Sequence, residues 1–279
     1  MSSGNTRRAR RRRRNRIIVT GSILAVALIA AIIWVLVTGD FSRGSDGTNF
    51  SGSVSGSEIS GGSEEEAGEE IPTETVTPTP EPVEISTEGL YSDYALLLRL
   101  SDDEILMNKA GTEQMYPASM TKIMTALVAI ENLPNLDEMV TVTAEEINPV
   151  YELGASLAGF NAGETVSVRD LLYGVILPSG ADACRALADR VAGSEEAFVD
   201  LMNQKAQEIG MDSTHFVTST GLHDPNHYTT CYDIAKLLEY AIQNETFRTV
   251  FTTHTYTTAA TEYHPEGITF TSSAFAQMA

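Results

Sequence analysis

The residues best suited to chemistry are Ser119 and Lys122, which lie three positions apart at the start of an apolar run. In a helix that begins at about Ser119, the two side chains share one face and are one turn apart. A serine hydroxyl is a poor nucleophile until a base takes its proton, and a lysine amine of lowered pKa is such a base. Five apolar residues would bury this helix and hold the pair rigidly: Ile123, Met124, Leu127, Val128 and Ile130. The spacing therefore predicts a serine nucleophile with a lysine proton acceptor.

A purely structural interpretation of the pair is a helix N-cap at Ser119 followed by a solvated lysine. The S-x-x-K pattern alone is weak, since it occurs about once by chance in a chain of this length. Two features favour chemistry over capping. The chain has only four lysines, and the pattern uses one of them. A cation in the first turn also opposes the helix dipole, which costs stability without a structural gain.

A second serine, Ser179, lies at a corner between two apolar segments, 169–177 and 181–192, that are expected to be helical. Pro178 and Gly180 on either side of it break the helical pattern. The corner places the Ser179 hydroxyl near the positive end of a helix dipole. A plain capping role for Ser179 is the structural alternative.

The N-terminal region predicts a membrane anchor. Residues 7–16 carry eight arginines, although the whole chain has a formal net charge of −20. The next 21 residues, 17–37, have no charge and are long enough to cross about 30 Å of hydrocarbon. Because basic residues before a span stay in the cytoplasm, we expect a cytoplasmic tail at 1–16, a single-pass anchor at 17–37 and an extracellular remainder. A nucleic-acid-binding arm and a cleaved signal peptide are the alternatives.

The segment after the anchor, residues 38–86, is rich in Ser, Gly, Glu, Thr and Pro and has few large apolar side chains. This composition cannot bury enough surface to fold. It predicts a disordered linker whose reach is on the order of 40 Å. Residues 87–279 are the predicted folded domain, which the linker would hold away from the membrane.

Hydrophobic periodicity within the folded domain predicts both strands and helices. Strands are expected at 94–100, 104–108, 140–143, 213–217 and 249–258, and 150–165 is expected to be a loop. Helices are expected from about 119 and at 169–177, 181–192, 196–209 and 232–243. Strands at both ends with helices between them predict an α+β fold rather than alternating βαβ units.

Other residue patterns give little support for a cofactor, a metal or nucleic acid. His223, Asp224 and His227 form a possible zinc set, but they lie in a proline-containing loop without a metalloprotease motif. Cys184 and Cys231 are expected to be two small buried apolar residues, with a disulfide as the alternative. Glycine-rich phosphate loops and basic aromatic surfaces are absent from the sequence. We expect no cofactor, no metal and no nucleic-acid partner.

Several motifs, in order, resemble one enzyme family. PASMTK is similar to the S-x-x-K element of serine penicillin-interacting enzymes, and LLYGVILPSGADAC to their second element, usually Ser-x-Asn. The text MNQKAQEIGMDSTHFVTSTGLHDPNHYTTCYDIAKLLEYAI resembles D-alanyl-D-alanine carboxypeptidases, the low-molecular-mass penicillin-binding proteins. The resemblance covers about residues 90–260. It implies a penicillin-binding-protein or serine β-lactamase-like fold, with an antiparallel sheet, flanking helices and a helical subdomain.

The resemblance also implies a reaction and its residues. Ser119 would attack the carbonyl between the two terminal D-alanines of a peptidoglycan stem peptide, Lys122 would accept the serine proton, and Ser179 would relay a proton to the leaving amine. The backbone N–H of Ser119 and one from a later strand would form the oxyanion hole. β-Lactams would acylate Ser119 as substrate mimics.

Two departures from the family pattern lead to further expectations. Ala181 stands where the family usually has an Asn that donates to the substrate amide. No Lys-Thr-Gly or Lys-Ser-Gly occurs, and Lys236 lies in a predicted helix. We therefore expect residues 87–279 to be a partial catalytic domain, incomplete at the C-terminus. We also expect the 279-residue chain alone to fold poorly or to acylate slowly. The competing interpretations are a non-catalytic wall-binding scaffold of the same fold, a β-lactamase and a zinc D,D-peptidase.

Overall fold

A computed structural model of the chain describes residues 85–277. The helical elements are η1 (Ala118–Met120), α2 (Thr121–Asn132), α3 (Ala144–Glu152), α4 (Val168–Ile176), α5 (Ala181–Ala192), α6 (Glu195–Glu208), α7 (Cys231–Ala241), α8 (Glu245–Phe251) and η2 (Phe275–Gln277). The strands are β1 (Ala95–Arg99), β2 (Glu104–Lys109), β3 (Met139–Thr141), β4 (Thr165–Ser167), β5 (Thr255–Thr257) and β6 (Thr269–Thr271). The mixture of helices and short strands confirms the α+β class.

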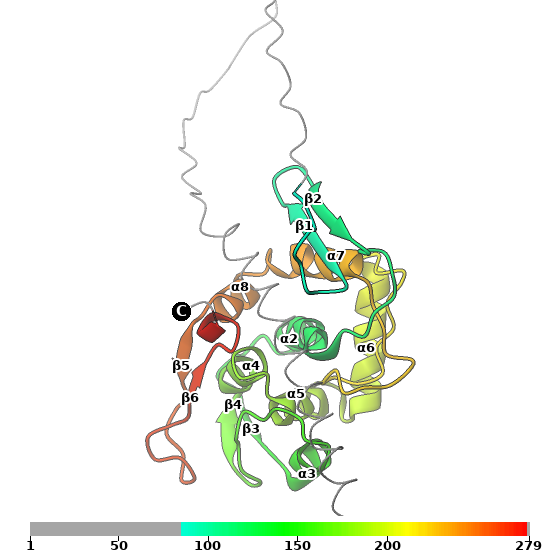
Figure 1. Ribbon diagram of the computed structural model, residues 1–279. Helices are drawn as coiled ribbons and strands as arrows, with labels where there is room; N and C mark the ends of the chain where they lie inside the picture. The colour runs from blue at the N-terminus through cyan, green and yellow to red at the C-terminus, as the bar shows by residue number, and fades with distance from the viewer. Residues whose placement is uncertain (1–84, 278–279) are drawn as a thin grey trace, which may run out of the picture.

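Helix α2 forms the centre of the fold. Every side chain from 121 to 130 is buried, including those of Thr121, Lys122 and Thr125. A helix that is buried on all sides belongs to a core rather than to a surface. Figure 1 shows α4, α5, α6 and α7 arranged around α2, and α8 also contacts it. The helix that carries the S-x-x-K pattern is therefore held by neighbours on every side.

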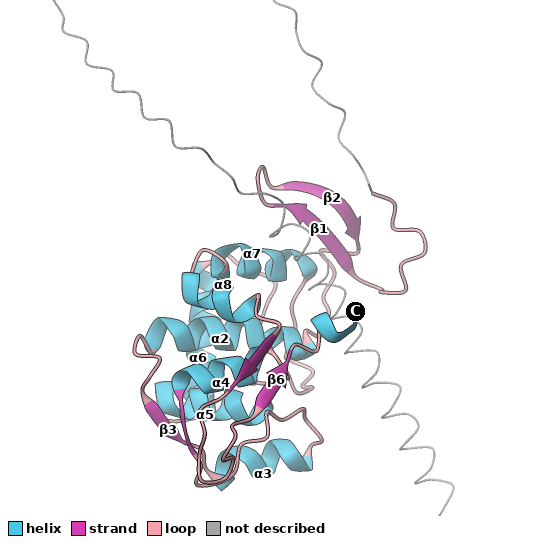
Figure 2. Cartoon of the chain, turned by 90° about the vertical axis from the view of Figure 1, so that its left-hand side faces the viewer, coloured by secondary structure: helices cyan, strands magenta, loops and turns pink. Residues whose placement is uncertain are grey.

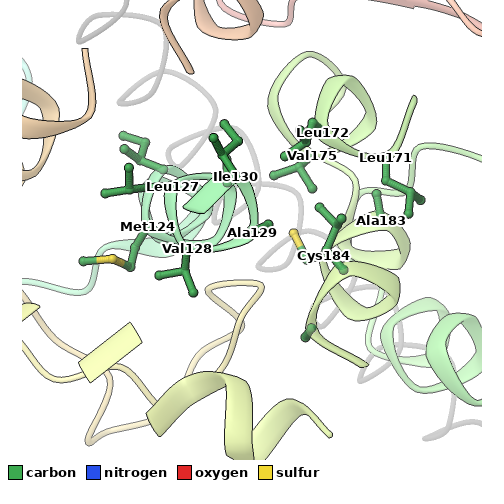
Figure 3. Packing of buried hydrophobic residues seen from close by; sticks show 14 of the residues in the cluster. Met124, Leu127, Val128, Ala129, Ile130, Leu171, Leu172, Val175, Ala183 and Cys184 are labelled. Atoms are coloured by element: carbon green, nitrogen blue, oxygen red, sulfur yellow. The ribbon is translucent and has the colours of Figure 1, made fainter. Parts of the chain in front are cut away.

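Apolar side chains of α2 point outward around the helix, and Ala129 faces Cys184 of α5 (Figure 3). The cluster includes Met124, Leu127, Val128, Ala129 and Ile130 of α2, Leu171, Leu172 and Val175 of α4, and Ala183 and Cys184 of α5. Small residues at the α2–α5 contact let the two helices approach closely, and close packing of this kind resists displacement. The N-terminal ends of α2 and α5, where the two candidate serines lie, are thereby fixed relative to each other.

The strands form three separate antiparallel pairs, β1–β2, β3–β4 and β5–β6. Each strand has three to six residues, and the pairs lie at different places on the edge of the helical core (Figure 2). This differs from the single antiparallel sheet that the sequence analysis expects. Because no strand of one pair lies beside a strand of another within residues 85–277, the helices pack against one another instead of against a shared sheet.

The expected strand at 249–258 is wrong over its first half. Helix α8 continues to Phe251, and only Thr255–Thr257 is extended. Asn244 starts this helix, because its side chain accepts a hydrogen bond from the backbone N–H of Phe247. The hydroxyls of Thr249 and Thr252 donate to carbonyls four residues earlier, so these polar groups are satisfied locally.

Two other boundaries differ from expectation. The segment 213–217 makes one isolated bridge, between His215 and Tyr228, instead of a strand. The expected loop at 150–165 begins inside α3, which reaches Glu152 and starts from a capping box of Thr143 and Glu146. By contrast, the helices expected at 169–177, 181–192, 196–209 and 232–243 are present with ends shifted by about one residue.

The predicted tail at 1–16, the anchor at 17–37 and nearly all of the 38–86 linker lie outside the described residues. In the part of the chain that is described, none of the helices has the length and apolar character needed to cross a membrane.

Candidate active site

Ser119 lies in the short 3-10 turn η1, immediately before α2. Neither η1 nor α2 has a side-chain cap, so Ser119 does not act as an N-cap. The residue before it, Ala118, has a φ of 47°, which is in the left-handed region. Such a conformation is costly for alanine and persists where surrounding contacts enforce it, often at functional sites. The hydroxyl of Ser119 is thus left free for chemistry.

The Lys122 amine lies within reach of that hydroxyl, as the spacing predicts. Its Nζ is 3.4 Å from the Ser119 Oγ and donates a hydrogen bond of 2.7 Å to the carbonyl oxygen of Thr220. The lysine side chain is almost fully buried. Burial lowers the pKa of Lys122, although the nearby Cys184 and Asp182 oppose this shift. The environment therefore makes the neutral amine, which is the form that can accept a proton, more accessible than in an ordinary lysine.

Ser179 reaches the same hydroxyl from the other side. Its Oγ donates a hydrogen bond of 3.0 Å to the Ser119 Oγ. Its φ of 62° is left-handed, whereas the N-cap of α5 is Gly180, which makes no side-chain cap. Ser179 is therefore not a helix cap, and its strained backbone directs the hydroxyl toward Ser119.

The corner that carries Ser179 is locked by the buried carboxylate of Asp182. It accepts hydrogen bonds from three successive backbone N–H groups, at 158–160, with lengths of 2.7, 3.0 and 3.3 Å. Gly180 fits tightly here, since a Cβ at this position would lie 2.7 Å from the backbone nitrogen of Ala158. Asp182 thereby ties the start of α5 to the chain that follows α3 and fixes the position of Ser179.

A third segment, residues 217–221, completes the site from a distant part of the chain. Its Thr220 carbonyl accepts the hydrogen bond from the Lys122 amine, and its Ser219 carbonyl accepts a hydrogen bond of 2.6 Å from the Thr125 hydroxyl. Gly221, with a φ of 77°, lies directly against the carbonyl oxygen of Ala118. The 217–221 segment therefore runs along the first turns of α2.

His227, a possible zinc ligand by its sequence, makes hydrogen bonds within the protein instead. Its Nε2 lies 2.7 Å from the Thr121 Oγ1, and its Nδ1 accepts hydrogen bonds from the backbone N–H groups of Val217 and Thr218. Both ring nitrogens are thus used within the protein. Across residues 85–277, no group of three or more His, Cys, Asp or Glu side chains is placed to hold a metal ion.

Ala181 and the two cysteines have no direct part in this geometry. The methyl group of Ala181 is buried, and its backbone N–H donates to the carbonyl of Ser156. Cys184 is buried beside Lys122 and Cys231 is partly buried, and both are free thiols rather than a disulfide. Burial raises the pKa of Cys184 to about 12 and that of Cys231 to about 11, so both remain protonated at neutral pH.

The sequence pattern located three of the residues that meet here but missed three others. The contacts of Asp182, Thr220 and His227 join segments far apart in the chain, and no short motif records them. A local signal existed only for Asp182, an acidic residue in the first turn of a predicted helix, which is a common and unspecific feature. The residue type of His227 makes it a metal-ligand candidate in the sequence, but the polar loop around it gives no signal of its burial.

A serine hydroxyl held between a buried lysine amine and a second serine, at the start of a central helix, is an arrangement suited to a serine enzyme that works through an acyl intermediate. Comparison with known proteins agrees with this class. Residues 81–273 match the family model described as D-alanyl-D-alanine carboxypeptidase, and the chain belongs to that family.

Relatives of known name support the assignment. The D-alanyl-D-alanine carboxypeptidase DacF of Bacillus subtilis is 37% identical over 150 residues, which are 52% of this chain and 39% of DacF. The D-alanyl-D-alanine carboxypeptidase DacC of Escherichia coli is 40% identical over 166 residues, which are 54% of this chain and 41% of DacC. The chain therefore spans about two fifths of the length of these curated relatives.

The fold is also found in solved structures. The crystal structure of the Streptomyces K15 DD-transpeptidase superimposes with a TM-score of 0.58 and 34% identity, covering 62% of this chain and 70% of that one. This similarity confirms the expected penicillin-binding-protein type of fold.

Proposed function

We propose that this protein is a serine-type D-alanyl-D-alanine carboxypeptidase that removes the terminal D-alanine of peptidoglycan stem peptides. The observation that carries the proposal is the chain of polar contacts from Ser179 through Ser119 to Lys122. The Ser179 hydroxyl donates to Ser119, which leaves the proton of Ser119 free to move to the amine. Membership of the carboxypeptidase family supports the choice of substrate.

Acylation begins when the Ser119 oxygen attacks the carbonyl carbon between the two D-alanines while its proton passes to the Lys122 lone pair. Thr220 helps to orient that lone pair, because a carbonyl only accepts hydrogen bonds and so fixes the direction of one N–H of the amine. The carbonyl oxygen of the substrate becomes an oxyanion, which backbone N–H groups near Ser119 would stabilise.

Collapse of the tetrahedral intermediate breaks the peptide bond and leaves an ester on Ser119. Ser179 gives its hydroxyl proton to the leaving nitrogen and is reprotonated from the Lys122 ammonium, so D-alanine departs with a neutral amine. Lys122, again neutral, then takes a proton from water as the water attacks the ester carbonyl. The bond from that carbon to the Ser119 oxygen breaks, and the Lys122 ammonium returns its proton to the oxygen. The shortened peptide and free Ser119 are the products. β-Lactams would follow the same first step and remain attached as long-lived esters.

A fluorescent penicillin tests the nucleophile directly. We expect the full chain to become covalently labelled, at the slow rate that the missing Lys-Thr-Gly predicts, with the label on the tryptic peptide that contains Ser119, and Ser119→Ala to take no label. D-Alanine release from an N-acylated peptide ending in D-Ala-D-Ala tests the hydrolysis. Wild-type chain that neither takes the label nor releases D-alanine would contradict the enzyme proposal and favour the non-catalytic scaffold.

The same measurements separate a carboxypeptidase from a β-lactamase. A carboxypeptidase releases D-alanine and keeps the penicilloyl ester, whereas a β-lactamase loses the ester quickly and hydrolyses penicillin in many turnovers. Ala181 offers no side-chain donor to a substrate amide, so we expect weaker binding of the peptide than an Asn at this position would provide.

We further propose that the protein is a single-pass membrane protein with residues 1–16 in the cytoplasm, an anchor at 17–37, a linker at 38–86 and the domain from 87 onward outside. The arginine-rich start, the uncharged 21-residue segment and the acidic linker support this arrangement. The full chain should sediment with membranes, and a variant lacking 17–37 should not. Protection of the domain from protease added to intact cells would contradict the orientation.

A further inference from the structure

The ring of His227 joins the two parts of the chain that hold the Lys122 amine. One part is the first turn of α2, where Thr121 is the immediate neighbour of Lys122. The other is the 217–221 segment, whose Thr220 carbonyl accepts a hydrogen bond from the amine. The ring lies between them, contacting Thr121 through Nε2 and the backbone at 217 and 218 through Nδ1. It is therefore placed to set the distance between the lysine and its carbonyl partner.

The hydrogen bonds determine the tautomer of His227. Backbone N–H groups only donate, so Nδ1 must accept from Val217, at 2.9 Å, and from Thr218, at 3.3 Å. The ring proton is then on Nε2, which donates to the Thr121 hydroxyl oxygen. Only the neutral Nε2–H form can make both sets of bonds, because a protonated ring would direct an N–H against the backbone donors.

The ring is held firmly enough to act as a rigid spacer. The side chain is 2% exposed and packs edge-on against Phe216, with 5.7 Å between ring centroids. The two residues that follow it, Tyr228 and Thr229, are anchored by backbone bridges to His215 and Met115. The backbone on which His227 stands is therefore fixed to the rest of the domain.

We propose that His227 is a positioning residue for acylation: its neutral ring holds the 217–221 segment against the start of α2, so that the Thr220 carbonyl orients the Lys122 amine toward Ser119. This inference rests on the proposed function, because it concerns the base of that reaction. His227 touches neither the nucleophile nor the substrate site directly. It acts through Thr121 and through the backbone of the 217–221 segment.

Two conservative variants test the two ring nitrogens of His227 separately. His227→Gln places an amide N–H near the Nε2 position and loses the acceptor for Val217. His227→Asn keeps an acceptor near Nδ1 and does not reach Thr121. Thr121→Val removes the same Thr121 bond from the opposite side at nearly constant shape. If the bond between Thr121 and His227 carries the effect, the double variant Thr121→Val/His227→Asn is no slower than either single variant.

We expect each of these variants to reduce the acylation rate with the fluorescent penicillin by about 10- to 100-fold, because small displacements of a catalytic group cost this much. The matched control is His215→Asn, which removes an exposed histidine bonded to the Asn226 carbonyl outside the 217–221 segment. It should acylate at the wild-type rate. Variants of His227 that acylate as fast as His215→Asn would overturn the inference.

A second readout does not depend on activity. The pH titration of the Lys122 side chain, followed by NMR of its ε-carbon, should move in His227→Gln and His227→Asn and remain unchanged in His215→Asn. The groups that face Lys122, Cys184 and Asp182, are the same in all variants, and those around His227 are Asp224, His215 and His223. The His215→Asn control therefore also shows what the loss of one neighbouring histidine does.

Amide hydrogen exchange at Val217 and Thr218 should accelerate in His227→Gln, which loses the Nδ1 acceptor. If the wild-type chain takes no penicillin, the proposed function fails, and the Lys122 titration and the amide exchange still decide the positioning role. An unchanged titration together with unchanged exchange in both His227 variants would contradict it.

Discussion

Gly221 lies so close to the carbonyl oxygen of Ala118 that a Cβ at Gly221 would overlap that oxygen. The two residues are far apart in the sequence, yet their contact brings the 217–221 segment against the turn that carries Ser119. Because Gly221 also has a φ of 77°, it meets two demands at once, a left-handed backbone and a close approach.

Gly221→Ala should therefore lower the rate of acylation by penicillin at least about 100-fold. Gly193→Ala is the matched control, since Gly193 has the same φ of 77° and nothing within 4 Å of the position of an added Cβ. Its cost should be only the backbone strain, about 1–2 kcal/mol in the free energy of unfolding. Equal effects of the two substitutions on acylation would show that the close contact has no functional weight.

Ser179→Ala should slow acylation and hydrolysis while leaving the unfolding midpoint nearly unchanged. The hydroxyl donates to Ser119 and contributes no helix cap, so its loss removes a proton relay rather than a structural bond. A reduction of about 100- to 10,000-fold is typical for the loss of a group that transfers protons. The rates come from D-alanine release, and the midpoint from urea denaturation. A large loss of stability would instead indicate a structural serine.

Lys122 should give acylation a rising pH dependence. Burial lowers the pKa of its amine below the ordinary 10.5, so the reactive neutral form increases as pH rises through that lowered value. Lys122→Arg should acylate at least about 100-fold more slowly over the same range, because a guanidinium has no neutral form to accept the proton. A flat pH profile in the wild-type chain would be incompatible with Lys122 as the base.

Asp182→Asn should destabilise the protein by about 2–4 kcal/mol and also slow acylation. The carboxylate accepts three backbone N–H bonds at 158–160, and an amide directs its own N–H groups against some of these donors. The control is Asp200→Asn, which alters an exposed carboxylate on α6. Urea denaturation of both variants gives the difference. If Asp182→Asn unfolds at the wild-type midpoint, the carboxylate does not lock the corner.

His227 should make the folded state sensitive to acid. Burial lowers its pKa to about 4 from the ordinary 6.5, so the unfolded chain binds a proton at this residue more readily than the folded chain does. Its contribution to stability is complete above pH 6.5 and falls as the pH drops toward 4, by about 3 kcal/mol in total. Urea denaturation between pH 7 and 4 should show this loss, and it should be smaller in His227→Asn. Parallel pH curves for the two proteins would assign the loss to other groups.

The sequence alone determined the parts of this protein that depend on neighbours along the chain. The one-turn spacing of Ser119 and Lys122 in an apolar run placed Lys122 on α2 and Ser119 in the turn η1 just before it. The corner at Pro178 and Gly180 placed Ser179 between α4 and α5. Helical periodicity also located α4, α5, α6 and α7. These features arise from local geometry and from burial of one face, which residue order records directly.

Only the tertiary structure decided what surrounds these residues. The carbonyl that accepts the hydrogen bond of Lys122 belongs to Thr220, 98 residues after the lysine. The ring beside Thr121 belongs to His227, 106 residues after that threonine. The first contact uses a backbone carbonyl, a group that every residue possesses, and the second joins two side chains far apart in the chain, so no short sequence pattern distinguishes either of them. Likewise, alternating threonines suggested a strand where the Asn244 cap and the burial of Phe247 and Val250 produce helix α8. Local order supplied the nucleophile and its base, whereas packing across the chain fixed their orientation.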